Sequence, residues 1–153
     1  MNVSHIPEGY HSVTPSLSAR DAKAAIDFYT RAFGAVLKFK LEEPSGKIAH
    51  AELQIGNSRV MISDEYPDYG GIAPEIGKGG SFMIYVEDVD AAFAQAVAAG
   101  ATPVQEPTDM FWGDRAGRLH DPVGYRWTLA SHMRDVSQQQ MQEAMRAWGE
   151  GNS

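Results

Sequence analysis

His50 and Glu52 are the two side chains of this sequence best placed to carry out chemistry together. They are separated by one residue in the run KIAHAELQI (47–55), whose apolar residues alternate as in a strand. Side chains two positions apart on a strand point to the same face, so the imidazole and the carboxylate should lie side by side. Such a pair could act in acid–base catalysis, bind a ligand, or form a hydrogen-bonded polar pair lining a solvated cleft. The sequence leaves all three interpretations open.

A metal site is an alternative role for the same residues. With His120 from the other half of the chain, His50 and Glu52 could form a non-standard site of two histidines and one glutamate for a divalent metal. Cysteine is absent from the 153 residues, which excludes thiolate ligands, disulfides and cysteine nucleophiles. We therefore expect no cofactor, with a divalent metal as the alternative. If a reaction is catalysed, His50 and Glu52 are the candidate catalytic residues.

Aromatic and cationic side chains supply further candidate contacts. Phe111-Trp112-Gly113-Asp114-Arg115 combines two rings, a glycine turn and a charge pair, and could close over a flat or extended ligand. The Asp114–Arg115 pair is equally typical of turn chemistry at a sheet edge. Asp121-Pro122-Val123-Gly124 indicates a hairpin turn. The predicted ligand-binding residues are His50, Glu52, Tyr85, Trp112, Arg115 and Arg126.

Two series of strands and helices must position these residues. In the first, residues 10–18 alternate as a strand, Ser18 is a candidate N-cap, and Gly34 ends the helix that follows. Strand-like runs then cover 35–43, 47–55 and 58–65. In the second series, a strand over 81–88 precedes a helix from Val89 that ends at Gly100, and strand-like segments follow at 102–106, about 110–121 and 124–131.

The alternation also assigns faces to the strands. If Glu52 faces a cleft, the residues that share its side of the sheets are His50, Gln54, Ser81, Met83, Tyr85, Arg126, Thr128 and Ala130. The opposite faces are apolar and should form the core. They comprise Ala51, Leu53, Ile55, Phe82, Ile84, Val86, Trp127 and Leu129.

The order strand–helix–strand–strand–strand thus occurs twice, and AIDFYTRAFGA (25–35) compares directly with AFAQAVAAGA (92–101). We predict an α+β fold of two tandem βαβββ modules, about 8–66 and 79–132, joined by the linker 67–78 within one domain over 1–132. Residues 133–153 should form a helical tail. In this tail Ser137 caps a helix whose Met141, Met145 and Trp148 form one stripe, which packs on the body or on a second subunit.

The composition excludes several classes of function. The chain carries 13 basic and 20 acidic side chains, for a net charge of −7, and no cluster of Lys and Arg, so we expect no nucleic-acid partner. No apolar run approaches the roughly 18 residues of a membrane span. The N-terminus lacks the basic and apolar stretches of a secretory signal. We expect no membrane partner and a cytoplasmic location.

Several motifs together resemble the vicinal oxygen chelate superfamily, which includes glyoxalase I, extradiol dioxygenases, and fosfomycin- and bleomycin-resistance proteins. They are DAKAAIDFYTRAFGA (21–35), VEDVDAAFAQAVAAGA (86–101) and DPVGYRWTL (121–129). HAEL (50–53), SDE (63–65) and GDRAGRLHDPVGYRW (113–127) are most similar to its PhnB-like branch. The resemblance covers about residues 10–132. It implies a curved mixed sheet whose concave side holds the site, and a homodimer, often with exchanged modules.

In the metalloenzymes of that superfamily, four inward-facing positions on the first and last strands of the modules hold the metal. Carried over by motif, these positions are Thr14, Glu52 in the HAEL strand, Ser81 and Thr128. Only Glu52 is a competent ligand, because neutral hydroxyls bind divalent transition metals weakly. The resemblance therefore favours a metal-free protein that binds a small molecule, aromatic or cationic, as the bleomycin-resistance proteins do. The alternative is a glyoxalase-like lyase, isomerase or dioxygenase with a non-standard metal site or a His50/Glu52 acid–base pair.

Overall fold

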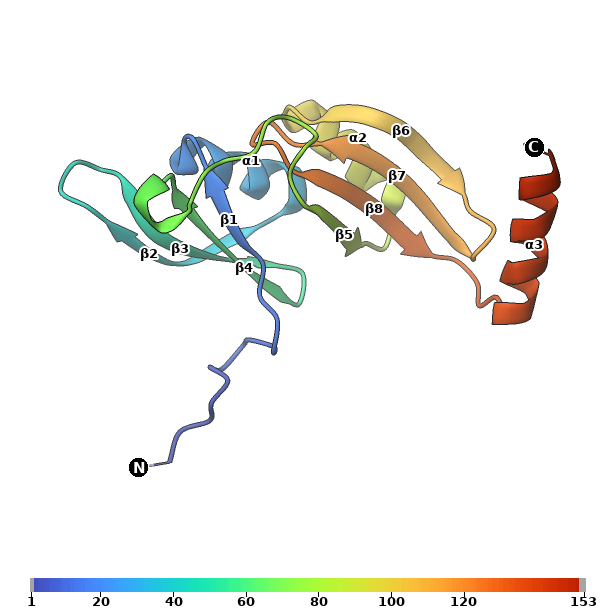
Figure 1. Ribbon diagram of the computed structural model, residues 1–153, viewed down its shortest axis with the longest axis horizontal. Coiled ribbons are helices and arrows are strands. Elements are labelled where there is room, and N and C mark those ends of the chain that lie inside the picture. The colour runs from blue at the N-terminus through green and yellow to red at the C-terminus, as the bar shows by residue number, and fades with distance from the viewer. Residues whose placement is uncertain (1, 152–153) are drawn as a thin grey trace.

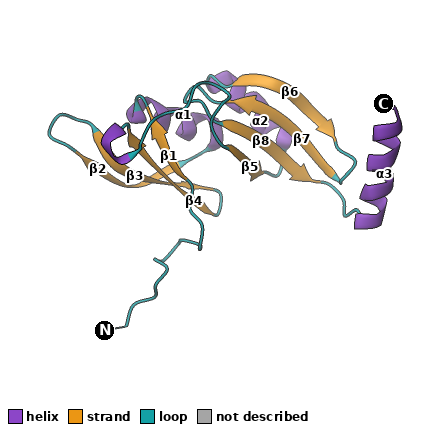
Figure 2. Cartoon of the chain, in the orientation of Figure 1, coloured by secondary structure: helices purple, strands orange, loops and turns teal. Residues whose placement is uncertain are grey.

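The computed structural model describes residues 2–151 and shows two βαβββ modules followed by a C-terminal helix (Figures 1 and 2). The first module comprises β1 (Ser16–Ala19), α1 (Ala22–Phe33), β2 (Val36–Glu42), β3 (Ile48–Ile55) and β4 (Ser58–Asp64), and a short 3-10 helix η1 (Pro67–Tyr69) follows it. The second module comprises β5 (Ser81–Tyr85), α2 (Val89–Ala99), β6 (Thr102–Asp109), β7 (Asp114–His120) and β8 (Arg126–His132), and α3 (Gln138–Gly151) follows. The predicted α+β fold with two tandem modules is confirmed.

Each module contains one four-stranded sheet, and the two sheets have equivalent strand orders, β1-β4-β3-β2 and β5-β8-β7-β6. In each sheet the first strand of the module pairs in parallel with the last, and the remaining neighbours are antiparallel. The two sheets therefore show in the structure the internal duplication that the sequence indicates. It also leaves β1 and β5 as edge strands of their sheets.

The hydrophobic core runs without interruption from one module into the other. The rings of Phe33 on α1 and Trp127 on β8 lie 4.8 Å apart, and Tyr29 packs on the same indole at 5.7 Å. Gln95 on α2 donates a hydrogen bond to the carbonyl oxygen of Arg31 on α1. The helices therefore pack together and cover one face of each sheet, which leaves the other face of each sheet without helices.

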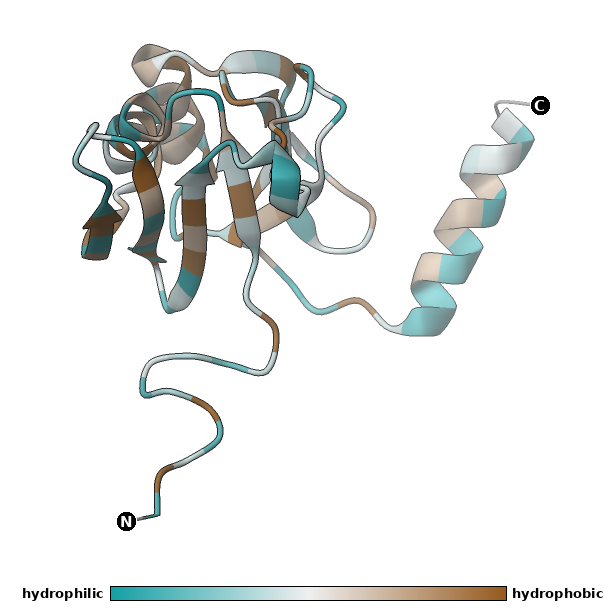
Figure 3. Ribbon diagram, turned by 60° about the vertical axis from the view of Figure 1, so that its left-hand side comes forward, coloured by the Kyte–Doolittle hydropathy of each residue, from teal (hydrophilic) through white to brown (hydrophobic). Residues whose placement is uncertain are grey.

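The predicted core faces agree with the burial of the strands, and Figure 3 shows the alternation of apolar and polar residues along them. Ala51, Leu53, Ile55, Trp127 and Leu129 are all buried, whereas Ser81, Met83 and Tyr85 are exposed. Period-two alternation was a reliable guide on β3 and β8 because one face of each of these strands is buried.

Helix α1 begins later than the sequence predicts. Ser18 belongs to β1, and Asp21 is the N-cap, whose side chain accepts a 3.1 Å hydrogen bond from the backbone N–H of Ala24. Aspartate and serine cap helices about equally well, so Ser18 and Asp21 were both possible N-caps. Ser18 is excluded because it lies within the strand β1. Gly34 ends the helix as predicted, in the left-handed conformation (φ 67°) that favours glycine.

Helix α3 stands apart from both sheets in the two views (Figures 1 and 3). Ser137 caps it as predicted, since its Oγ accepts a hydrogen bond from the backbone N–H of Gln140. Met145 and Trp148 are 44% and 61% exposed, so the predicted packing of this stripe on the body is not observed. Packing on a second subunit stays a prediction. The last two residues of the predicted tail, and Met1, lie outside the described residues.

No helix within residues 2–151 combines the length and the apolar character that crossing a bilayer requires.

Candidate functional site

His50 and Glu52 lie on the face of β3 that the helices leave uncovered, as the alternation predicts. Their Nε2 and Oε2 atoms are 3.8 Å apart. Glu52 also accepts a hydrogen bond from the hydroxyl of Tyr10. Residues 10–15 are therefore not the strand that the sequence predicts, since β1 begins only at Ser16, and the N-terminal segment instead reaches across this face. The carboxylate of Glu52 thus has two polar neighbours.

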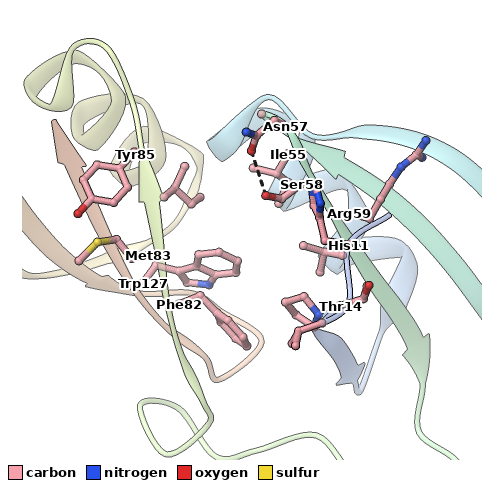
Figure 4. A pocket seen from close by; sticks show the side chains of 15 residues that line it. His11, Thr14, Ile55, Asn57, Ser58, Arg59, Phe82, Met83, Tyr85 and Trp127 are labelled. Atoms are coloured by element: carbon pink, nitrogen blue, oxygen red, sulfur yellow. Dashed lines mark hydrogen bonds between the residues drawn. The ribbon is translucent and has the colours of Figure 1, made fainter. Parts of the chain in front are cut away.

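A groove of about 510 Å³ lies between the two modules (Figure 4). One wall is β5, with the indole of Trp127 beside it, and the other wall is the β3–β4 hairpin together with the N-terminal segment. We call it the inter-module groove. Its lining residues are His11, Val13, Thr14, Pro15, Ile55, Gly56, Asn57, Ser58, Arg59, Val60, Phe82, Met83, Ile84, Tyr85 and Trp127.

Tyr85 is the one predicted ligand-binding residue that lines this groove. Its hydroxyl donates a 2.9 Å hydrogen bond to Oδ2 of Asp114, a buried carboxylate whose other oxygen lies 2.8 Å from Nδ1 of His132. This hydrogen bond, together with burial, raises the pKa of Tyr85. Burial alone would raise the pKa of Asp114, but hydrogen bonds from His132, Tyr85 and Trp112 outweigh it and lower that pKa. The ring of Tyr85 is therefore held in place by a charged acceptor.

Trp112 and Arg115 do not line the groove. Trp112 lies in the β6–β7 turn, where its side chain hydrogen-bonds to Asp114. Arg115 was predicted to bind ligand, but it lies on the helix-covered face of β7, where its guanidinium contacts Asp90 of α2 at 2.9 Å and Asp109 at 3.1 Å. These hydrogen bonds raise its pKa. Because β7 begins at Asp114, the alternation turns Arg115 towards α2.

Arg126 lines a second, smaller depression of about 310 Å³ on the open face of the second module, which we call the cationic depression. Its lining residues are Ser81, Val104, Arg118, Leu119, His120, Arg126, Trp127 and Thr128. Cross-strand pairing places Ser81, Arg126 and His120 in one row. Within residues 2–151, no group of three or more His, Asp or Glu side chains could hold a metal ion. His120 therefore does not form a three-residue metal site with His50 and Glu52.

The positions that hold the metal in the metalloenzymes do not fit a metal here. Glu52 was assigned to one of them, but it lies on β3, whereas the last strand of the module is β4, on which Met61 pairs with Glu52. The donors that remain are the hydroxyls of Thr14, Ser81 and Thr128 and the thioether of Met61. Neutral hydroxyls and one thioether are weak ligands for a divalent transition metal.

Some side chains of the groove were not predicted. Arg59 pairs with Gln54 on the open face of the first sheet, and its guanidinium lies 5.4 Å from the ring of Tyr10. Its Nε is buried and has no hydrogen-bond partner among the described residues. Strand alternation from Glu52 could have found it. His11 also lines the groove, and it lies before β1 in the stretch that the sequence predicted as a strand.

Known proteins support the fold assignment. The family model described as Glyoxalase/Bleomycin resistance protein/Dioxygenase superfamily matches residues 9–129. An uncharacterized protein of Mycobacterium tuberculosis, Rv0887c, is 40% identical over 145 residues, covering 92% of this chain and 85% of that protein.

Two further relatives carry a name. The Arabidopsis thaliana protein named lactoylglutathione lyase GLX1 is 32% identical over 113 residues, covering 71% of this chain and 40% of that protein. The crystal structure of TioX from Micromonospora sp. ML1 superimposes with a TM-score of 0.66 at 29% identity, covering 80% of this chain and 99% of TioX. The family match includes most of both βαβββ modules, so this chain belongs to the glyoxalase/bleomycin resistance protein/dioxygenase superfamily.

Proposed function

We propose that this chain is a metal-free small-molecule binding protein of the bleomycin-resistance type, and that its ligand lies in the inter-module groove. The observation that carries the proposal is the groove itself, with its wall of Phe82, Met83 and Tyr85 and the indole of Trp127. Its volume of about 510 Å³ is within the usual range for small-molecule sites, roughly 300–1,000 Å³. Rings and a thioether favour an apolar, flat ligand.

Polar groups of the groove would orient this ligand. Buried donors in folded proteins almost always have an acceptor, so the unpaired Nε of Arg59 supports a ligand oxygen at this point. Tyr85 lines the groove at β5, and its hydroxyl is bonded to Asp114. A ring held in this way loses little conformational freedom when a ligand stacks on it.

A catalytic role for His50 and Glu52 is the second candidate. It is supported by the 3.8 Å contact between the two side chains and by the similarity to a protein named lactoylglutathione lyase. The pair does not line the inter-module groove, and Glu52 already accepts a hydrogen bond from Tyr10. The binding role therefore explains more of the observed geometry than the acid–base role does.

A screen of aromatic compounds by protein NMR tests the proposal. Compounds that bind should shift the amide resonances of β5 and of the β3–β4 hairpin. Met83→Ala should weaken their binding by about fivefold, the loss expected when one apolar contact is removed. Met133→Ala is the matched control, because Met133 is exposed and lies outside the groove. Equal losses in the two variants would contradict the location.

Metal content separates the two candidates. The purified protein, without an affinity tag, is analysed for bound elements and titrated with Ni²⁺, Zn²⁺, Mn²⁺ and Fe²⁺ by calorimetry. The binding role predicts no stoichiometric metal. Stoichiometric metal that is lost in His50→Ala would instead support a lyase, isomerase or dioxygenase with a non-standard site.

A further inference from the structure

We propose that the cationic depression is a subsite for an anionic group of the ligand, namely a carboxylate, which Arg118 and Arg126 bind. The inference rests on the proposed function and adds to it the chemical class of the ligand, an aromatic or flat apolar acid. It replaces the earlier expectation of an aromatic or cationic ligand with an aromatic or flat apolar ligand that carries an acidic group.

The strand register brings the basic side chains together. His120 on β7 pairs directly with Arg126 on β8, and the next pair on the same face is Arg118 with Thr128. Directly paired residues have Cβ atoms about 5 Å apart, and diagonal neighbours about 7–8 Å, so both guanidinium groups can reach one small anion. The hydroxyls of Ser81 and Thr128, which line the same depression, are further donors.

The pairing of the arginines distinguishes the two faces of the protein. On the helix side, Arg31 pairs with Asp27 at 2.9 Å and Arg115 pairs with Asp90 at 2.9 Å. On the open face, neither Arg118 nor Arg126 has an acidic partner within 4.0 Å among residues 2–151. The guanidinium of Arg126 donates a 3.4 Å hydrogen bond from its Nε to the carbonyl oxygen of Gly79.

Two neighbouring arginines without a counter-charge repel each other, and a bound anion removes this cost. The chain has 20 acidic side chains, yet none of those described neutralises this pair. Guanidinium groups bind carboxylates through two parallel hydrogen bonds, which gives direction as well as affinity. The depression therefore has the chemistry of a carboxylate site.

The subsite continues from the inter-module groove along β5. Ser81 lines the cationic depression, and Met83 and Tyr85, two and four residues further along the same face, line the groove. Trp127 borders both. A ligand with an apolar body against Met83 and Tyr85 would thus place an acidic group beside Arg126, the cross-strand neighbour of Ser81.

Two probes that differ in charge alone test the inference, 2-naphthoate and its neutral analogue 2-naphthamide. Their dissociation constants are measured by NMR titration of the wild-type chain and of Arg118→Gln, Arg126→Gln and the double variant. Both arginines are exposed, so the variants should remain folded, which thermal unfolding verifies. Arg146→Gln on α3 is the control for the loss of one positive charge.

We expect wild-type protein to bind 2-naphthoate at least about tenfold more tightly than 2-naphthamide, and the double variant to lose this preference while its affinity for the amide stays unchanged. Equal affinities for the two probes would overturn the subsite and leave the proposed function intact. No binding of 2-naphthoate would also overturn the subsite, whereas the proposed function is judged by the separate compound screen. If Arg146→Gln reduced the preference for 2-naphthoate as much as the substitutions of Arg118 and Arg126 do, only the overall charge of the protein would matter. This result would also overturn the subsite.

Discussion

The hydroxyl of Tyr29 on α1 donates a 2.6 Å hydrogen bond to Oδ2 of Asp121 in the β7–β8 turn, so that one side-chain pair joins the helix of the first module to the sheet of the second. The same oxygen accepts from the indole N–H of Trp127, and Oδ1 accepts from the backbone N–H groups of Val123, Gly124 and Tyr125. Asp121 is 1% exposed. Five donors therefore compensate for the burial of this carboxylate.

Replacing Asp121 should destabilise the protein strongly. In Asp121→Asn the amide NH₂ would face buried donors, so we expect the free energy of unfolding to fall by about 3 kcal/mol or more. Tyr29→Phe removes one bond and should cost about 1–2 kcal/mol. Urea unfolding followed by circular dichroism measures both. Asp68→Asn on the exposed η1 is the control, and an Asp121 variant no less stable than this control would contradict the assignment.

The stability of the protein should depend on the charge of His132. Hydrogen bonds to Asp135 at 2.7 Å and to Asp114 at 2.8 Å raise the pKa of His132 above its ordinary value of 6.5. Since the pKa is higher in the folded state, this contribution to stability is complete below pH 6.5 and is lost as the pH rises through the folded value. The lowered pKa of Asp114 acts in the opposite sense, because its contribution is present above pH 3.8 and is lost at more acidic pH.

NMR titration of the His132 ring measures the pKa of this residue directly. We expect a pKa above 6.5 in the wild-type protein and a lower one in Asp135→Asn. His132→Gln should flatten the dependence of the unfolding free energy on pH between pH 6.5 and the higher pKa of the folded state. A His132 pKa at or below 6.5 would show that the two carboxylates do not act on the ring as the geometry indicates.

Arg115 should be dispensable for ligand binding. Its guanidinium is held by Asp90 and Asp109 on the helix-covered face. Arg115→Gln should therefore leave the affinity for 2-naphthoate unchanged and lower the melting temperature slightly, in contrast to Arg126→Gln. Calorimetric titration and thermal unfolding of the two variants provide the comparison. A weaker affinity in Arg115→Gln without any loss of stability would place this residue back in the site.

We predict that the protein is a homodimer. Val36, Phe39 and Leu41 on β2 are 53%, 45% and 51% exposed, and contiguous exposed apolar residues usually mark an interface. Sedimentation equilibrium should give a mass near twice 16.7 kDa. Phe39→Asp should shift the protein towards monomer, whereas Val3→Asp, at an exposed position on the N-terminal segment, should not. A monomer at all concentrations in the wild-type protein would refute the prediction.

The sequence predicted the parts of the site that depend on local periodicity. On β3 and β5, alternation identified which side chains face the helices, because one side of β3 is buried and one side of β5 is half-buried. The same rule places Arg115 on the helix-covered side of β7, since Leu119, four residues later, is buried against the helices.

No local sequence pattern indicated the contacts between residues far apart in the chain. Tyr10 and Glu52 are separated by 42 residues, and Tyr29 and Asp121 by 92. Neither tyrosine lies in a motif that indicates a carboxylate partner. The inter-module groove could not be located for the same reason, because its two walls come from different modules and their distance depends on how the helices pack.

The β3–β4 hairpin that forms one wall of the groove turns at Gly56 and Asn57, and Gly56 has a positive φ of 56°. Such a turn at the surface tolerates insertions and deletions far better than a buried strand does. The opposite wall, β5, is held by its pairing with β8. A change in the length of this turn would therefore widen or narrow the groove without disturbing the shared core, which gives the fold a simple way to vary the size of this groove during evolution.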